Sequence, residues 1–295
     1  MGFLQASKTI VPALTVLVVT LALSACSGEE GRKAQSPSEG GGSEVAPAGV
    51  PEKPLHPRFD MDRKGLSALV GELPPSTQER IMENPYAFLD LAEKLLNEPR
   101  NLLRVVDKEH PLPEEYEPTD LVDLAEYDDE LLLNREGLSL RRSIMDDLLA
   151  MVDAARKAGI ELPISSSYRS YRYQAWLFDY WVEELGREEA ERSSARPGTS
   201  QHQLGTTVDF GSVTNAFADT EAGRWVAENA HRFGFSLSYP DGYEELTGYK
   251  YESWHFRYIG RPAARMERTF FGGIQHRLLH FWRDARDGLE AAYTP

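Results

Sequence analysis

The sequence predicts an α+β fold. Segments with apolar residues at helical spacing mix with short strand-like runs, and the regular βαβ alternation typical of a parallel sheet is missing from the pattern. Apolar residues make up 41% and aromatic residues 10% of the 295 residues, which is enough to bury a core. A wholly disordered chain is therefore excluded.

Residues 1–25 have the pattern of an export signal, in which Lys8 precedes an uncharged apolar run from Thr9 to Ala25. The run is at the short end of what spans a bilayer, so an uncleaved membrane anchor is the alternative. Leu23-Ser24-Ala25-Cys26 resembles the lipobox of bacterial lipoproteins. The resemblance implies cleavage before Cys26, lipidation of that residue, and export to the outer face of the cytoplasmic membrane or to the outer membrane.

Residues 26–57 are dominated by Ser, Gly, Pro and Glu, including the run Gly40-Gly41-Gly42. Such a composition cannot bury enough apolar surface to offset the entropy lost on ordering. We expect a flexible tether that begins at the lipid-bearing Cys26.

Residues 58–100 predict a small helical accessory segment. Apolar residues recur at helical spacing between Phe59 and Asn97, and Pro74-Pro75 and Asn84-Pro85 interrupt the pattern. This predicts two or three short helices, which carry no catalytic constellation.

Residues 101–262 predict the mixed helix and strand domain, and 263–295 a C-terminal helix. Strands are expected at 102–106, 164–169, 206–210, 235–239 and 254–259, and helices at 140–157, 171–185 and 220–231. An extended stretch is expected between Pro111 and Pro118. Trp176, Tyr180 and Trp181 are expected to pack into the core rather than to form an exposed platform for sugars.

Charge and cysteine content exclude two classes of function. With 32 Lys and Arg against 47 Asp and Glu, the net charge of -15 repels phosphate backbones and argues against nucleic acid as a partner. The single cysteine excludes an intramolecular disulfide and a cysteine-rich zinc cluster. Histidines and carboxylates must therefore hold any metal.

Two segments combine histidines with carboxylates, one containing His202 and Asp209 and the other Glu252 and His255. Two imidazoles and one carboxylate can hold zinc and leave a position for water, while a further carboxylate takes the proton of that water. The spacing favours His202 in a loop before a strand that carries Asp209. A turn near Ser253 is required if Glu252 and His255 are to face the same metal, because residues three apart lie on opposite faces of a straight strand.

His276 and His280 form a competing pair, since histidines four residues apart share one face of a helix. The stretch His276-Arg-Leu-Leu-His280 lacks the Glu that a zinc-peptidase helix carries directly after its first His. A structural or surface role is favoured for this pair.

Six pieces of the chain, in order, carry a family resemblance: Pro111-Leu-Pro113; Ser166-Ser-Tyr-Arg169-Ser-Tyr with Gln174; Ser200-Gln-His202-Gln-Leu-Gly-Thr-Thr-Val-Asp209; Glu228-Asn-Ala-His-Arg-Phe-Gly-Phe235; Tyr239-Pro-Asp-Gly242; and Thr247-Gly-Tyr-Lys-Tyr-Glu252-Ser-Trp-His255-Phe-Arg-Tyr-Ile-Gly260. Together they resemble the zinc D-alanyl-D-alanine carboxypeptidases of the VanY type, from about Leu102 to Gly260. Ser167 departs from the pattern, because the family often has Gly there.

The resemblance implies Zn²⁺ held by His202, Asp209 and His255, with Glu252 as the catalytic base. It also implies the fold of the hedgehog and DD-peptidase type, an antiparallel sheet with packed helices.

The resemblance further implies that Arg169 faces the substrate. Arg169 would stabilise charge on the carbonyl oxygen or clamp the terminal carboxylate of the peptide. Ser200 and Gln174 are further candidates for substrate binding, although either can instead serve as a helix cap or a surface polar group.

The implied reaction is removal of the terminal D-alanine from peptidoglycan stem peptides, and export suits a substrate outside the cytoplasmic membrane. An L,D-carboxypeptidase or a peptidoglycan endopeptidase would use the same zinc centre. A non-catalytic cell-wall binding lipoprotein is the alternative from another class, and it would have no need for Glu252.

Overall fold

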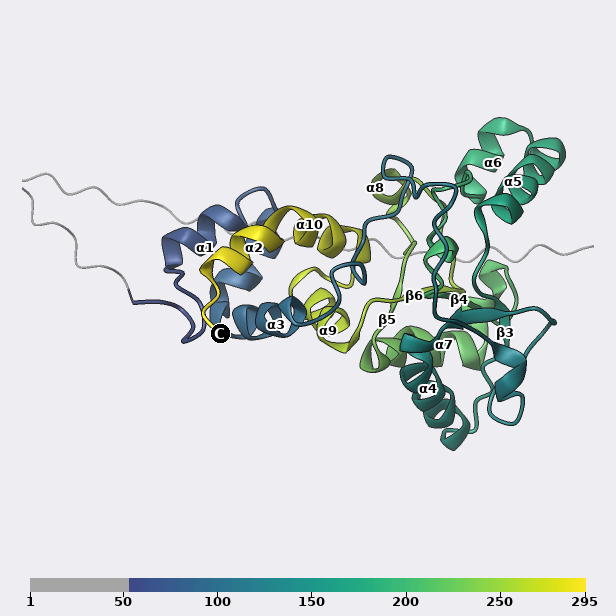
Figure 1. The fold of residues 1–295 in the computed structure, drawn as a ribbon, viewed down its shortest axis with the longest axis horizontal. Coiled ribbons are helices and arrows are strands. Elements are labelled where there is room, and N and C mark those ends of the chain that lie inside the picture. Colours follow the sequence, from purple (N-terminus) through teal and green to yellow (C-terminus); the bar gives the residue numbers. More distant parts are fainter. Residues whose placement is uncertain (1–52) are drawn as a thin grey trace, which may run out of the picture. The chain divides into compact units, whose positions relative to one another are not determined.

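The computed structural model describes residues 53–295 (Figure 1). Its main sheet has four antiparallel strands. The strand order is β3 (Ile164–Ser166), β4 (Thr207–Phe210), β6 (His255–Tyr258) and β5 (Phe235–Leu237). Four of the five expected strands therefore form, and they confirm the α+β class.

The register of this sheet brings distant polar residues together. Asp209 on β4 lies opposite His255 on β6 and opposite Ser166 on β3. Directly opposite residues of an antiparallel pair project from the same face of the sheet. The neighbouring residues Val208 and Phe256 project from the other face into an apolar core.

Two helices cover that apolar face, α4 (Met145–Lys157) and α7 (Glu221–Asn229). The expected helix from residue 140 begins five residues later, because Ser139–Arg141 forms strand β2. This strand pairs with β1 (Leu121–Asp123) in a two-stranded sheet that the sequence pattern did not predict.

Helix α5 (Tyr171–Leu185) has the expected bounds and is followed by α6 (Arg187–Ser193). The expectation for the α5 aromatic residues was wrong at two positions, since Trp176 is 59% exposed and Tyr180 is 42% exposed. A helical pattern identifies a face of a helix but not whether another element covers it. On α5 only Gln174 and Phe178 are buried.

The remaining short helices are α8 (Glu244–Thr247) and the 3₁₀ turns η1 (Leu124–Tyr127), η2 (Arg142–Ile144), η3 (Gln201–Leu204), η4 (Asn215–Asp219) and η5 (Ala230–Phe233).

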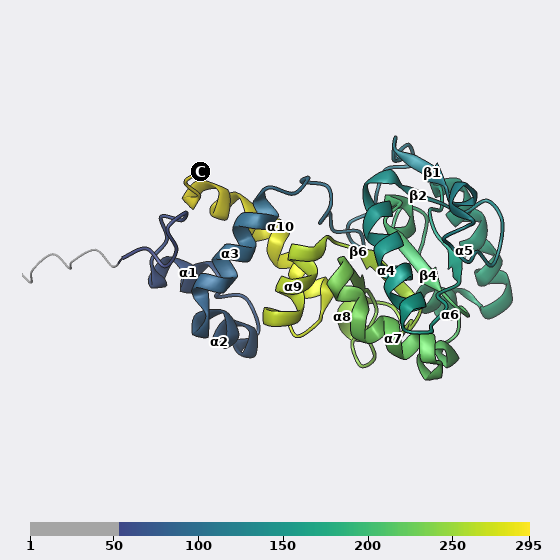
Figure 2. The same cartoon turned by 90° about the horizontal axis from the view of Figure 1, so that it is seen from below.

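A helical module is built from both ends of the described chain (Figure 2). It contains α1 (Arg63–Leu69), α2 (Pro75–Glu83), α3 (Pro85–Leu96), α9 (Arg261–Phe270) and α10 (Gln275–Ala292). These helices share one apolar core. The segment expected to be one C-terminal helix is thus two helices, separated by a turn with Gly272 and Gly273 at positive φ.

Backbone pairing joins the two ends of this module. Phe59 bridges Tyr293, the amide of Asp60 donates to the carbonyl of Ala292, and Thr294 donates to Arg58. Leu55 and His56, which the sequence assigned to the tether, already contact the module. Leu55 packs against its core, and the buried ring of His56 lies 4.6 Å from the ring of Tyr86. The mixed domain is therefore inserted between the two halves of one helical core.

The arm (residues 101–118) connects α3 to the mixed domain. The strand expected at 102–106 was wrong, because these residues form a turn and irregular backbone. The buried guanidinium of Arg257 on β6 donates to the carbonyls of Leu102 and Arg104, at 2.9 and 2.8 Å. A side chain, not a neighbouring strand, thus satisfies the backbone here.

The export signal and Cys26 lie outside the described residues, as does most of the expected tether. Within residues 53–295, each helix is too short or too polar to cross a membrane.

Replacing Glu267 with Gln is expected to stabilise the helical module at neutral and alkaline pH. Burial raises the pKa of the Glu267 carboxyl to about 8 from an ordinary value of 4.5. The folded state thus holds this proton more tightly than the unfolded state, so stability is lost as pH rises from about 4.5 to about 8. Glutamine cannot ionise and escapes this loss.

Thermal unfolding at pH 4 and pH 8 measures the effect. We expect Glu267→Gln to match the wild type at pH 4 and to exceed its Tm by several degrees at pH 8. The exposed Glu79→Gln on α2 is the matched control. A Tm difference independent of pH would contradict the account.

Candidate metal centre

Three buried side chains converge on the polar face of the sheet: His202 in η3, Asp209 on β4 and His255 on β6. His202 Nε2 lies 3.2 Å from Asp209 Oδ2, and His255 Nδ1 lies 3.1 Å from Asp209 Oδ1. One donor atom of each residue lies within 4.8 Å of the others. The sequence proposed these three residues as ligands, and the fold brings them together.

Local backbone geometry sets the position of His202. It lies in a single 3₁₀ turn capped by the Ser200 hydroxyl, which accepts from the His202 amide at 3.3 Å. The turn ends at Gly205, whose φ of +70° leads the chain into β4. A Cβ at Gly205 would lie 2.9 Å from Arg141 Cγ, so this position requires glycine on both counts.

Neighbouring groups orient the two imidazole rings. The carbonyl of Ser167 can only accept, so His202 Nδ1 donates to it at 2.6 Å and leaves the lone pair of Nε2 facing Asp209. His255 Nε2 lies 3.3 Å from Gln201 Oε1, which leaves Nδ1 facing Asp209. Contacts of this kind fix the tautomer of metal-binding histidines.

The donor set fits a divalent cation. His202 Nε2 and Asp209 Oδ1 are buried, and neither has a hydrogen-bond partner among residues 53–295. Buried polar atoms without partners are rare, and a cation held between them would satisfy both.

The protonation states also suit a metal. Burial, together with the positive charge of Arg169, lowers the pKa of His202 to about 4, so its ring is neutral. Burial acts to raise the pKa of Asp209, yet that pKa lies well below its usual range. The Arg169 guanidinium, which donates to Asp209 Oδ2 at 3.1 Å, favours the ionised carboxylate. A neutral imidazole and an ionised carboxylate are the forms that bind metals.

The side chain of Glu252 also lies beside the cluster of His202, Asp209 and His255, because the backbone turns between Glu252 and His255. The His255 amide donates to the Glu252 carbonyl at 3.2 Å, which closes the turn around Ser253 that the alternation argument required. Glu252 Oε2 then lies 3.4 Å from His255 Nδ1. Burial and the negative charge of Asp209 raise the pKa of Glu252 to about 8.

Arg169 is held against the metal-ligand candidate Asp209. Its Nη2 donates to Asp209 Oδ2 at 3.1 Å, its Nη1 to Gln174 Oε1 at 3.1 Å, and its Nε to Ser166 Oγ at 3.2 Å. Gln174 is fully buried and donates to the carbonyl of Ala195. Gln174 and Ser200, both candidates for substrate binding, are thus buried and engaged within the protein.

Two residues of the site were missed by the sequence reasoning. Gln201 accepts from Ser238 at 2.7 Å and contacts His255, and the ring of Tyr239 packs on His255 with centroids 4.8 Å apart. Both residues lie in segments that carry the family resemblance, 200–209 and 239–242, but spacing alone does not show where an individual side chain points.

Comparison with known proteins identifies the family. The model of the VanY family, D-alanyl-D-alanine carboxypeptidase, matches residues 137–261. The protein YodJ of Bacillus subtilis (strain 168) is 40% identical over 191 residues, covering 62% of this chain and 68% of YodJ. The D-alanyl-D-alanine carboxypeptidase of Enterococcus faecalis is 35% identical over 194 residues, with coverage of 62% and 68%. This chain belongs to the VanY family.

Solved structures agree with VanY membership. The LD-carboxypeptidase LdcB is 35% identical with a TM-score of 0.56, covering 61% of this chain and 86% of LdcB. A VanY D,D-pentapeptidase in complex with Zn(II) is 32% identical with a TM-score of 0.51, covering 60% and 98%. The predicted peptidase fold is therefore confirmed. The VanY family model includes none of α1–α3 or α10.

Proposed function

We propose that this VanY-family protein is a zinc-dependent carboxypeptidase that removes the terminal D-alanine from peptidoglycan stem peptides. The observation that supports it most directly is the buried triad of His202, Asp209 and His255 with Glu252 beside it. The VanY neighbour contains Zn(II), and the related VanYB was solved in complex with D-alanine-D-alanine. An enzyme of Enterococcus faecium that is 33% identical is a D-alanyl-D-alanine carboxypeptidase.

His202, Asp209 and His255 would hold zinc, whose charge makes water acidic enough to ionise near neutral pH and polarises a carbonyl group. Glu252 accepts a proton from the attacking water and returns it to the amino group of the departing D-alanine. The positive charge of bound zinc would favour the ionised form of the Glu252 carboxyl, which is the form that accepts this proton.

Arg169 has two candidate roles in this reaction, stabilising charge on the scissile carbonyl oxygen or clamping the substrate carboxylate. Its bonds to Asp209, Gln174 and Ser166 fix the guanidinium plane beside the triad. The side chain is 18% exposed, so part of it is accessible to a ligand.

Replacing Arg169 with Lys is expected to lower kcat/KM by about 10²-fold, because an ammonium keeps the charge but loses the planar fork. Steady-state kinetics on a D-Ala-D-Ala peptide separate the roles. A rise in KM alone assigns the carboxylate clamp, and a fall in kcat alone assigns the carbonyl oxygen. If Arg169→Lys has full zinc content and unchanged kcat and KM, Arg169 has neither of these catalytic roles.

An L,D-carboxypeptidase is the second candidate, and the similarity to LdcB favours it. The two activities differ in the bond cleaved, so two substrates separate them. The full chain is incubated with a pentapeptide ending in D-Ala-D-Ala and with a tetrapeptide ending in a single D-Ala, and released D-alanine is measured by mass.

Cleavage of the pentapeptide that a chelator abolishes and Zn²⁺ restores is the expected result. Cleavage of the tetrapeptide alone would establish the L,D activity instead. Loss of cross-links from purified sacculi would establish an endopeptidase, and no release from any of the three would leave the non-catalytic binding lipoprotein. Chelator-insensitive release would overturn the zinc mechanism.

We also propose that the protein is exported and anchored through lipid on Cys26. The lipobox-like sequence supports this, and the family acts on a substrate outside the cytoplasm. Cys26→Ala should move the protein from the membrane fraction to the soluble fraction and abolish incorporation of labelled palmitate. Retention of label would place the lipid elsewhere.

A further inference from the structure

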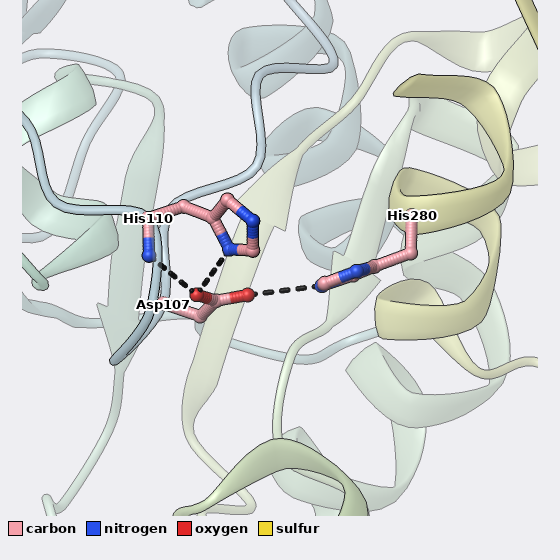
Figure 3. Close-up of side chains that lie close together, drawn as sticks. All are labelled: Asp107, His110 and His280. Atoms are coloured by element: carbon pink, nitrogen blue, oxygen red, sulfur yellow. Dashed lines mark hydrogen bonds and ion pairs between the residues drawn. The ribbon is translucent and has the colours of Figure 1, made fainter. Parts of the chain in front are cut away.

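A second cluster of metal-binding side chains lies outside the candidate metal centre, where the arm meets α10 (Figure 3). Asp107 and His110 come from the arm, and His280 comes from α10. One donor atom of each lies within 4.8 Å of the other two. The elements that carry them belong to different parts of the fold, so the cluster joins the arm to the helical module.

The carboxylate of Asp107 lies between the two rings, as Figure 3 shows. Its Oδ1 is 2.7 Å from His110 Nδ1, and its Oδ2 is 2.9 Å from His280 Nε2. Backbone amides of Glu109 and His110 also donate to Oδ1, at 2.9 Å each. One nitrogen of each ring is therefore aimed at a single carboxylate whose side chain is only 13% exposed.

The carboxylate is ionised in this setting. Burial acts to raise the pKa of Asp107, but the hydrogen bonds from His280 and His110 outweigh it and hold that pKa well below its usual range. Two imidazoles around an anionic carboxylate form a donor set that suits zinc, cobalt or nickel better than calcium or magnesium, which prefer oxygen ligands.

We propose that Asp107, His110 and His280 form a second transition-metal site, which clips the arm to α10. The ligand class is a divalent cation that favours imidazole, with Zn²⁺ as the representative. The role is structural, because the cluster spans the joint between the arm and the helical module rather than the polar face of the sheet.

Arg283 competes with this cation for the imidazole of His110. Its Nη1 donates to His110 Nε2 at 2.6 Å, which requires the proton of that ring to be on Nδ1. Metal binding at Nδ1 moves the proton to Nε2, so Arg283 must turn away. Its guanidinium is 40% exposed and already contacts Asp284, which gives it an alternative partner.

His276 lies one turn before His280 on α10, and the two rings stack with centroids 4.1 Å apart. Stacked rings present their faces to each other, so His276 is a neighbour of the site and not a ligand. His276 also lines a small cavity whose wall contains Gln201 and Tyr239, the two residues that contact His255.

The test counts metal on the full chain. Metal-free protein is titrated with Zn²⁺, dialysed and measured by atomic spectrometry, and we expect two equivalents in the wild type. His280→Gln and His110→Gln should each retain one equivalent and full chelator-sensitive peptidase activity. His276→Gln is the matched control and should keep both equivalents.

A second readout does not depend on activity. In a His202→Ala background, where the catalytic centre is disabled, Zn²⁺ should still raise Tm, because a ligand that binds only the folded state stabilises it. Adding His280→Gln should abolish that rise, and adding Arg283→Gln should strengthen Zn²⁺ binding severalfold.

One equivalent in the wild type, or a second equivalent that survives both His280→Gln and His110→Gln, would overturn the proposal. Loss of the second equivalent in His276→Gln would contradict the assignment of ligands. A wild-type protein that binds two equivalents of zinc but releases no D-alanine would instead count against the proposed function. Failure of the second metal site and failure of the proposed function are therefore distinguishable.

Discussion

Replacing Glu252 with Gln is expected to lower kcat for D-alanine release by about 10³-fold. The amide keeps the shape of the side chain and its place in the turn before His255, but it cannot take a proton from water. Zinc content should stay at the wild-type level, because the proposed ligands are untouched. The expected signature is thus a metal-loaded, folded and nearly inactive protein.

Steady-state kinetics and metal analysis on the same preparation measure this. Glu245→Gln on α8 is the matched control, since that side chain is exposed and should leave kcat unchanged. A Glu252→Gln protein with kcat within a few-fold of the control would show that the base is another residue.

Replacing His202 with Ala is expected to remove one equivalent of zinc and to reduce activity to the level of chelator-treated wild type. The loss follows because His202 supplies a buried nitrogen that faces Asp209 at 3.2 Å. Its removal leaves Asp209 with weaker compensation for its buried charge, so a fall in Tm of several degrees is also expected.

Zinc stoichiometry, activity and Tm are measured together on this variant. His231→Ala, in η5, is the control that removes an imidazole without touching the triad. Full activity and unchanged zinc in His202→Ala would exclude the proposed centre, whatever the outcome at the Asp107 cluster.

Much of the candidate site could be predicted from sequence. Period-two alternation along a strand predicts that Asp209 and Val208 point to opposite faces of the sheet. It also predicts that a turn is needed for Glu252 and His255 to face the same point. The pairing of Asp209 with His255 could not be predicted from pattern, because register is a contact between segments far apart in the chain. The family resemblance supplied that link.

The helical module was predicted only in pieces. Helical periodicity identified α1–α3 and helix near the C-terminus, but apolar faces do not say which partner they pack against. The ring of Phe88 on α3 lies 5.4 Å from Phe270 and 5.9 Å from Phe281, contacts that span most of the chain. The exposure of Trp176 was missed for the same reason, since the cover of a helix face is a tertiary property.

The shared core of this module can form only after α9 and α10 have been synthesised. Helices α1–α3 are made first, but Phe88 gains its partners only when α9 and α10 have been made. Until then the amino-terminal helices present an uncovered apolar face, which exposes the nascent chain to aggregation and to proteases. A product that ends before α10 would therefore keep an exposed apolar face on α1–α3, which quality-control proteases can recognise.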